Sequence, residues 1–197
     1  MANKKNAQAS ETALENAVKK IVQTLSDKER RQDQIIPLTR EIIRDCALGI
    51  KAVHAGDLKE TERKIDEIEG KLVKLHSLDE KLENVSQQCY QEYAEIKCLH
   101  AILTREPIPT YEEIGINLIP WLSGLADCVG ELRRAVQLAL SEGDAKKAKY
   151  YFEKMNAIYD NLMVIKFSSS LVGGLKHKQD VIRGQIEQAR SEMLRSA

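Results

Sequence analysis

Apolar residues recur at three- and four-residue steps along most of this chain, and this spacing constrains its fold more than any other feature. After Pro37, such steps place four apolar residues on one face of a helix: Ile42, Cys46, Ile50 and Val53. Only 4 prolines and 10 glycines occur in 197 residues, too few breaks for a fold of many short strands. The spacing therefore predicts long amphipathic helices.

The breaks between these helices are few and well marked. Pro37 predicts a kink or break in a helix over about 10–55, preceded by a frayed segment 1–9. Gly56-Asp57 and Gly143-Asp144 each combine a C-cap glycine with an N-cap aspartate. Thr110 and Glu113 form a capping box for a short helix. We expect further helices over about 57–75, 79–103, 120–142, 145–165 and 175–194, with a loop at 168–174.

The fold class that follows is all-α, an antiparallel helical bundle in a single domain over residues 1–197. Several helices carry apolar residues on more than one side, and aromatic residues make up only 5% of the chain. Burial of these faces between subunits would stabilise such a bundle, so we expect a homo-oligomer.

Charge and cysteine content exclude several classes of function. Thirty basic and thirty acidic residues cancel, so the net charge attracts neither nucleic acid nor an anionic membrane. The four cysteines form no CxxC pair and favour core thiols in a reducing compartment. No apolar run approaches the length of a membrane span. We therefore expect a cytoplasmic protein, with no membrane partner.

One acidic residue lies on an apolar seam. Glu92 falls on the helical face of Cys89, Ile96 and Leu99, where an unpaired carboxylate is costly. Glu95 lies one turn further on, at the edge of that face, so the two acids can share a cation. An ordinary solvated acid pair is the alternative.

A second acidic pair, Asp127 and Glu131, lies four residues apart in another helix. By its helical angle alone Asp127 would face solvent, and Glu131 could simply pair with Arg134. However, three small residues nearby allow another backbone to approach this face: Ser123, Gly124 and Gly130. If the two helices meet, four carboxylates converge, and oxygen ligands favour Mg²⁺ or Mn²⁺.

Basic residues form two groups that could contact phosphates, although solvated faces are the alternative. They are Arg40, Arg44 and Lys51 in the first group, and Lys176, Lys178 and Arg183, with His177, in the second. His54, His76 and His100 show no partner spacing, and no nucleophile triad or glycine-rich phosphate loop is visible.

The stretch WLSGLADCVGELRR, from Trp121 to Arg134, resembles the best-known segment of the translin/TRAX family. Two further segments resemble the TRAX branch of this family, namely YQEYAEI at 90–96 and LTREPIPTYEEI at 103–114. A third, LKHKQDVIR at 175–183, resembles the family in general. In this family translin binds single-stranded nucleic acid, and TRAX supplies Mg²⁺-dependent endoribonuclease activity within hollow octamers.

The resemblance implies roles for particular residues of this chain. It assigns the catalytic carboxylates to Glu92, Glu95 and Asp127, with Glu131 as a neighbouring metal ligand. Translin lacks an aspartate at the position of Asp127, which favours the catalytic branch. The cofactor implied is Mg²⁺, with Mn²⁺ as an alternative, and the assembly implied is a homo-octamer.

The chain departs from translin in one segment. Translin carries a His/Arg-rich stretch before the helix that matches Glu92, whereas this chain has LENVSQQCYQ at 82–91, which contains no basic residue. The leading hypothesis is an endoribonuclease that cleaves single-stranded RNA with a metal-activated water and leaves a 5′-phosphate. The alternatives are a non-catalytic module that binds single-stranded RNA or DNA, and a purely structural helical scaffold.

Overall fold

The computed structural model describes residues 2–78 and 83–196, and for 2–11, 83 and 84 only the backbone. These residues are helical almost throughout and contain no strand, which confirms the all-α fold class. The helices are α1 (Ala2–His54), α2 (Leu58–Leu78), α3 (Glu83–Thr104), α4 (Leu118–Ser141), α5 (Ala145–Met163), α6 (Ser169–Val172) and α7 (Leu175–Arg195).

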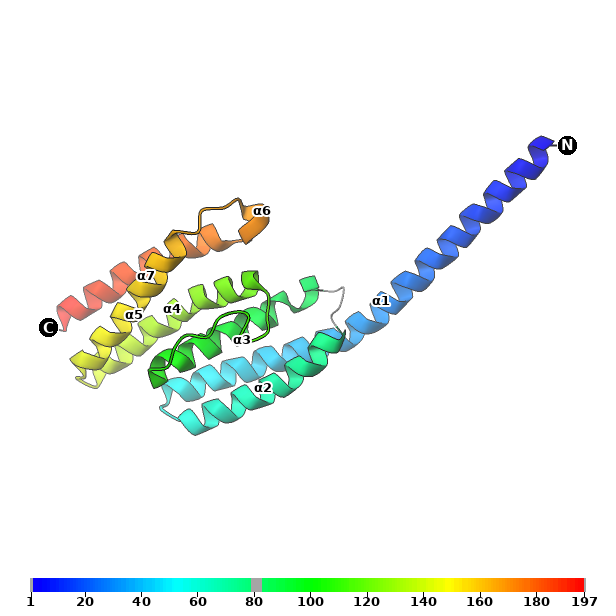
Figure 1. Cartoon of the computed structure of the whole chain (residues 1–197). Helices are drawn as coiled ribbons and strands as arrows, with labels where there is room; N and C mark the ends of the chain where they lie inside the picture. The colour runs from blue at the N-terminus through cyan, green and yellow to red at the C-terminus, as the bar shows by residue number, and fades with distance from the viewer. Residues whose placement is uncertain (1, 79–82, 197) are drawn as a thin grey trace.

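The bundle is built around α3 and α4, which lie against each other at its centre (Figure 1). On one side, α1 packs against α2 and α3. On the other side, α4 packs against α5 and α7. The acidic pairs expected on 79–103 and 120–142 therefore lie on the two central helices.

The helix α1 differs from the prediction in two respects. It begins at Ala2 rather than near residue 10, so segment 1–9 is helical over its described part. It also continues through Pro37 without a break. Proline lacks the N–H that would bond to the carbonyl of Asp33, but both residues are exposed, so water can satisfy that carbonyl. The first half of α1 projects away from the bundle (Figure 1).

The predicted caps are present. Gly56 has φ 75° and Gly143 has φ 74°, a region that favours glycine. The carboxylates of Asp57 and Asp144 accept hydrogen bonds from the backbone N–H groups of Glu60 and Lys147. Short turns of this kind make consecutive helices antiparallel.

Between α3 and α4, the capping box is confirmed, but the short helix is not. Thr110 N–H donates to Glu113 at 2.7 Å, and Glu113 N–H donates to the Thr110 hydroxyl at 3.2 Å. The chain makes a single turn there. A further difference is α6, which lies inside the loop predicted at 168–174.

The apolar faces form one continuous core along the bundle, and the stripes predicted for it are mostly buried. All four cysteines are buried and free, as expected for core thiols. Leu58, the first residue of α2, is 38% exposed and lies outside this core. Asp79 and Leu82, predicted at the start of α3, lie outside the described residues. Within the described ranges, no helix is long and apolar enough to cross a membrane.

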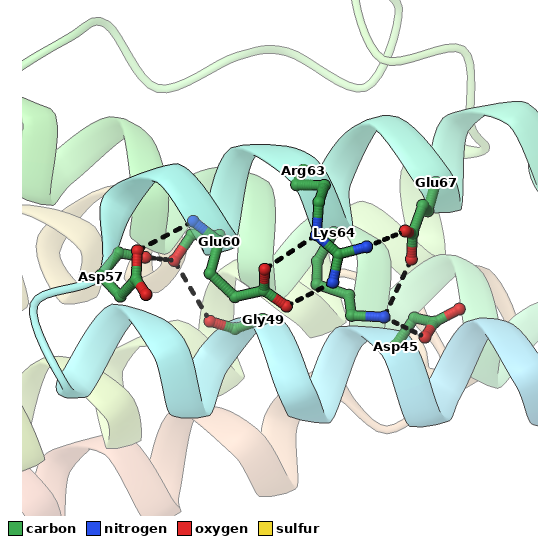
Figure 2. Close-up of polar contacts among 8 residues, drawn as sticks. Asp45, Gly49, Asp57, Glu60, Arg63, Lys64 and Glu67 are labelled. Atoms are coloured by element: carbon green, nitrogen blue, oxygen red, sulfur yellow. Dashed lines mark hydrogen bonds and ion pairs between the residues drawn. The ribbon is translucent and has the colours of Figure 1, made fainter.

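Ion pairs join α1 to α2 in addition to the apolar core, and Figure 2 shows the one between Lys64 and Asp45. Asp45 of α1 is only 7% exposed and accepts hydrogen bonds from Lys64 at 3.0 Å and from Lys71 at 2.5 Å, both of α2. Burial raises the pKa of Asp45, but the two lysines outweigh it and leave the pKa lowered. On the solvent side, Arg63 bonds to Glu60 and to Glu67.

Candidate metal centre and nucleic-acid interface

The central helices approach each other most closely at Gly124 of α4. A Cβ atom added there would collide with the Gln91 carbonyl oxygen, and would lie 2.7 Å from Ala94 Cβ and 2.9 Å from Glu95 N, all of α3. The small residue predicted to allow another backbone to approach thus lies directly on the helix that carries Glu92 and Glu95. This contact sets the separation of the two acidic pairs.

The four predicted carboxylates lie on α3 and α4, and the charges of Asp127 and Glu131 contribute to raised pKa values of Glu92 and Glu95. Glu95 is the most buried, at 8% exposed, whereas Glu92 is half-buried. The sequence had placed Glu92 on the seam and Glu95 at its edge, and the structure reverses that order of burial. Burial, together with the nearby charges of Asp127, Glu92 and Glu131, raises the pKa of Glu95 to about 8.

The other acid of α3 shows the same effect. Burial and the charge of Asp127 raise the pKa of Glu92, against an opposing hydrogen bond from Gln88 and the charge of Lys178. Carboxylates that raise one another's pKa are close enough to repel. The acids of α4 therefore act on the acids of α3 across the helix contact, and a cation placed among them would relieve this repulsion.

The two acids of α4 are held by polar partners. Asp127 accepts hydrogen bonds from Gln91 Nε2 at 2.6 Å and from Lys178 Nζ at 2.5 Å. The side chains of Asp127 and Lys178 are 30% and 23% exposed. Lys178, predicted to contact phosphates, therefore neutralises Asp127 in this structure.

Glu131 bonds to a histidine for which the sequence suggested no role. His54 Nε2 lies 2.6 Å from Glu131 Oε2, and the His54 side chain is 4% exposed. This hydrogen bond outweighs burial and leaves the pKa of Glu131 lowered. Arg134, the partner considered from the sequence, is 4.0 Å away. Sequence spacing gave no signal for His54, because 77 residues separate it from Glu131.

The chemistry of these donors fits a hard divalent cation. The four side chains supply only carboxylate oxygens, which Mg²⁺ and Mn²⁺ prefer, and two of them have raised pKa values. Across the described ranges, no three His, Cys, Asp or Glu side chains are gathered closely enough to coordinate an ion as they stand. Coordination by Asp127 would require Lys178 to give up its ion pair.

A cavity of about 370 Å³ adjoins the acids between α4 and α7. Asp127 and Glu131 line one wall, and His177, Lys178 and Gln185 line the opposite wall. A substrate in this cavity would contact both the acidic pair of α4 and the start of α7.

The remaining basic residues lie in two separate places. Arg40, Arg44 and Lys51 are exposed on α1. Lys176 and Arg183 are exposed on α7 and, with Lys166, line a second cavity of about 400 Å³. Arg183 also donates to the Tyr159 hydroxyl at 3.2 Å. The structure thus brings only Lys178 of the six predicted basic residues into the acidic site.

Among proteins of known sequence, the chain is similar to the uncharacterized protein MJ0175 of Methanocaldococcus jannaschii. The two are 34% identical over 178 residues, which cover 88% of this chain and 80% of that protein. The chain belongs to the family of MJ0175. No established family model matches the sequence.

Solved structures similar to this chain are C3PO proteins, which belong to the translin family. AfC3PO in complex with duplex RNA has a TM-score of 0.84 and 29% identity, covering 91% of this chain and 96% of its own. AfC3PO alone has a TM-score of 0.82 at the same identity and coverage. Apo-NeC3PO has a TM-score of 0.83 over 91% of this chain and 97% of its own, but at 18% identity it shows the fold alone. The translin-like fold is confirmed, whereas the TRAX-like branch stays a prediction.

Proposed function

We propose that this protein is a Mg²⁺-dependent endoribonuclease that acts on single-stranded RNA. The observation that carries the proposal is the close contact of α3 and α4 at Gly124, across which burial and the charges of the neighbouring acids raise the pKa of Glu95 to about 8. Such mutual repulsion in a partly buried site is typical of carboxylates that bind a cation or exchange protons. Mn²⁺ would serve as an alternative metal.

Glu92, Glu95 and Asp127 would hold the metal, and Glu131 would complete the set. The ion would supply Lewis-acid chemistry at a phosphodiester, polarising a phosphoryl oxygen and lowering the pKa of a water. Gln91 and His54 orient Asp127 and Glu131 through the two 2.6 Å contacts. Lys178, once released from Asp127, would lie beside the 370 Å³ cavity, where its charge suits an RNA phosphate.

RNA binding is also supported by similarity, because a relative with the same fold and 29% identity was solved with duplex RNA. Single-stranded RNA is our proposed substrate, with single-stranded DNA as a further ligand. Because the relative was solved with duplex RNA, each assay should also include duplex RNA. Lys176, Arg183, Arg40, Arg44 and Lys51 are the proposed phosphate contacts outside the acidic site, and we place the protein in the cytoplasm as a homo-octamer.

The direct test is incubation of the purified protein with 5′-labelled single-stranded RNA and, separately, duplex RNA. We expect cleavage of the single strand in Mg²⁺, none in EDTA, and loss of activity by at least 100-fold in Asp127→Ala, because removal of Asp127 takes away a ligand of the reacting site. Products should carry a 5′-phosphate. Circular dichroism and sedimentation should show that Asp127→Ala retains its helices and assembly.

The second candidate is a translin-like binding module without catalysis, and the ion pair between Lys178 and Asp127 favours it, since this lysine already neutralises one predicted ligand. That candidate expects a gel shift with RNA that EDTA leaves unchanged, and intact RNA after long incubation. Full cleavage by Asp127→Ala would contradict our assignment, while absence of any RNA affinity at low salt would leave only a structural scaffold.

A further inference from the structure

Lys178 of α7 and Asp127 of α4 form an ion pair at the edge of the acidic site. Lys178 Nζ lies 2.5 Å from Asp127 Oδ1, and the two side chains are 23% and 30% exposed. The other oxygen of the same carboxylate, Oδ2, accepts a hydrogen bond from Gln91 Nε2 of α3 at 2.6 Å. Both oxygens of Asp127 are therefore occupied, one by a neutral amide and the other by a full positive charge.

The charge of Lys178 lies among the acids to which a divalent cation would also be attracted. It acts on Glu92 and Glu95 as well, because it opposes the rise of their pKa values. While the ammonium group stays paired with Asp127, it would repel a cation bound to the same carboxylate. The lysine thus supplies part of the charge compensation that a metal would otherwise supply.

The side chain of Lys178 can pair with another group near Asp127. Asp127, Lys178 and His177 line the same cavity of about 370 Å³ between α4 and α7. A lysine ammonium is a compact charge on a flexible stem, so it can leave Asp127 while its backbone stays in place. An RNA phosphate that enters the cavity offers it a new partner.

The same cavity disfavours RNA while no metal is bound. Asp127 and Glu131 line one of its walls, and the lowered pKa of Glu131 keeps this acid ionised. A phosphate would be repelled by these carboxylates, and Lys178, the lysine that lines this cavity, is already bound to Asp127. The ion pair therefore opposes both ligands, and each ligand alone must break it.

We propose that Lys178 couples the binding of metal to the binding of RNA. In the free protein it occupies the side of Asp127 that a cation would take, and it exchanges Asp127 for an RNA phosphate when both ligands are bound. The ion pair is then broken only once, so each ligand strengthens the binding of the other by the same factor. This inference rests on the proposed nuclease function, because that function supplies both ligands.

Calorimetric titration of Mg²⁺ into the full-length protein without RNA tests the competition at Asp127. Lys178→Met removes the competing charge, and the matched control Lys176→Met removes the same charge from an exposed position on another side of α7. At about pH 9, above the pKa of about 8 of Glu95, we expect Lys178→Met to bind Mg²⁺ about fivefold more tightly than wild type. Lys176→Met should bind Mg²⁺ as wild type does. A variant that merely damaged the site would lose metal affinity rather than gain it.

The outcomes of this titration separate the inference from the proposed function. Equal Mg²⁺ affinity in Lys178→Met and wild type, or an equal gain in both variants, would overturn the role of Lys178 and leave the metal site in place. Absence of Mg²⁺ binding by wild type and by both variants would contradict the proposed function itself, and the inference with it.

Fluorescence anisotropy of a labelled single-stranded RNA tests the coupling, at constant ionic strength because phosphate contacts depend on salt. Readings on ice within seconds of mixing precede cleavage, and gel electrophoresis verifies that the strands are intact. We expect Mg²⁺ to tighten RNA binding about fivefold or more in wild type and in Lys176→Met, and much less in Lys178→Met. Equal tightening in all three proteins, or none in wild type, would overturn the proposal.

Discussion

At the scale of single residues, the acids of the site repel one another, and Lys178 and His54 bind two of them, Asp127 and Glu131. Glu95 and Glu92 have raised pKa values, whereas Glu131 has a lowered one because His54 bonds to it. The difference between these acids arises from their neighbours rather than from their residue type. The pH dependence of the free energy of unfolding should therefore depend on the protonation of these acids.

Glu95 should make the folded protein less stable as pH rises. Its pKa is about 8 in the folded chain and lies near 4.3 in an unfolded chain, so between these values the folded state binds the additional proton. The free energy of unfolding therefore falls as pH increases from about 5 to 8, and the contribution of the neutral carboxyl is lost above the folded pKa. Urea unfolding of Glu95→Gln should show a flatter pH profile and a higher stability than wild type at pH 8, by a few kcal/mol at most.

Addition of Mg²⁺ supplies the control for this prediction. If Glu95 binds the ion, Mg²⁺ should stabilise wild type more at pH 8 than at pH 6, because the bound carboxyl must lose its proton, and it should stabilise Glu95→Gln much less. Parallel pH profiles for the two proteins would show that Glu95 does not titrate as the structure indicates.

The close approach of the helices that carry the four acids was predictable from the sequence, but the polar partners of these acids were not. The position of Glu92 on an apolar helical face indicated a carboxylate that needs a partner. The small residues around Asp127 indicated close approach of another helix. His54, Gln91 and Lys178 reach the acids across 36 to 77 residues of sequence. Contacts of that kind depend on how helices dock, and helical spacing carries no information about docking.

At the scale of helices, the contact between α3 and α4 determines the geometry of the site. Spacing and capping residues predicted most helices, with differences at helix ends and at Pro37. The continuity of α1 through Pro37 was not predictable from local rules, because it depends on the exposure of that turn. Gly124 was predicted to allow close packing, and the structure identifies the backbone that fills its space.

Gly124→Ala should move α3 and α4 apart. The added Cβ meets backbone atoms of Gln91 and Glu95, which cannot move aside as a flexible side chain can. Overpacking of this kind destabilises by about 1–3 kcal/mol, and the shift should also reduce metal binding at the four acids. Chemical denaturation and metal titration measure the two effects.

Gly70→Ala is the matched control, because it is the same substitution inside a helix with nothing within 4 Å of the new Cβ. It should stabilise the protein by roughly 0.5–1 kcal/mol through helix propensity, with metal binding unchanged. If both substitutions had the same effect on stability, the close contact at Gly124 would be refuted.

Asp45→Asn should weaken the packing of α1 on α2. The substitution removes the negative charge that two lysines share at a site that is 7% exposed, and leaves Lys64 and Lys71 only their outer partners, Glu67 and Glu41. We expect a loss of about 2 kcal/mol, below the 3–5 kcal/mol of fully buried pairs because the Lys71 side chain is 31% exposed. Since the pKa of Asp45 is lowered, the difference from wild type should be present at pH 7 and should vanish as pH falls through the folded pKa.

Glu60→Gln, in the neighbouring exposed ion pair with Arg63, should change stability little, because exposed ion pairs contribute little. Equal losses in Asp45→Asn and Glu60→Gln at pH 7 would show that the inner ion pairs do not hold the two helices together.

At the scale of the whole molecule, the described chain consists of a helical bundle, which carries the acidic site, and the first half of α1, which projects from it (Figure 1). Composition and spacing predicted an all-α bundle and a need for burial between subunits. Composition and spacing did not predict that the first half of α1 projects from the bundle, because a kink or break was expected at Pro37. The helix instead continues through Pro37, so the first half of α1 projects from the bundle as part of the same helix (Figure 1).

The central claim is that acids from two helices share one divalent cation, and calorimetric titration of the purified protein with Mg²⁺ and Mn²⁺ tests it most directly. We predict about one ion bound per chain by wild type, with binding lost in both Glu92→Gln of α3 and Asp127→Asn of α4, and retained in Glu153→Gln, an exposed acid of α5. Wild-type binding by either of the first two variants, or no binding by wild type, would contradict the claim.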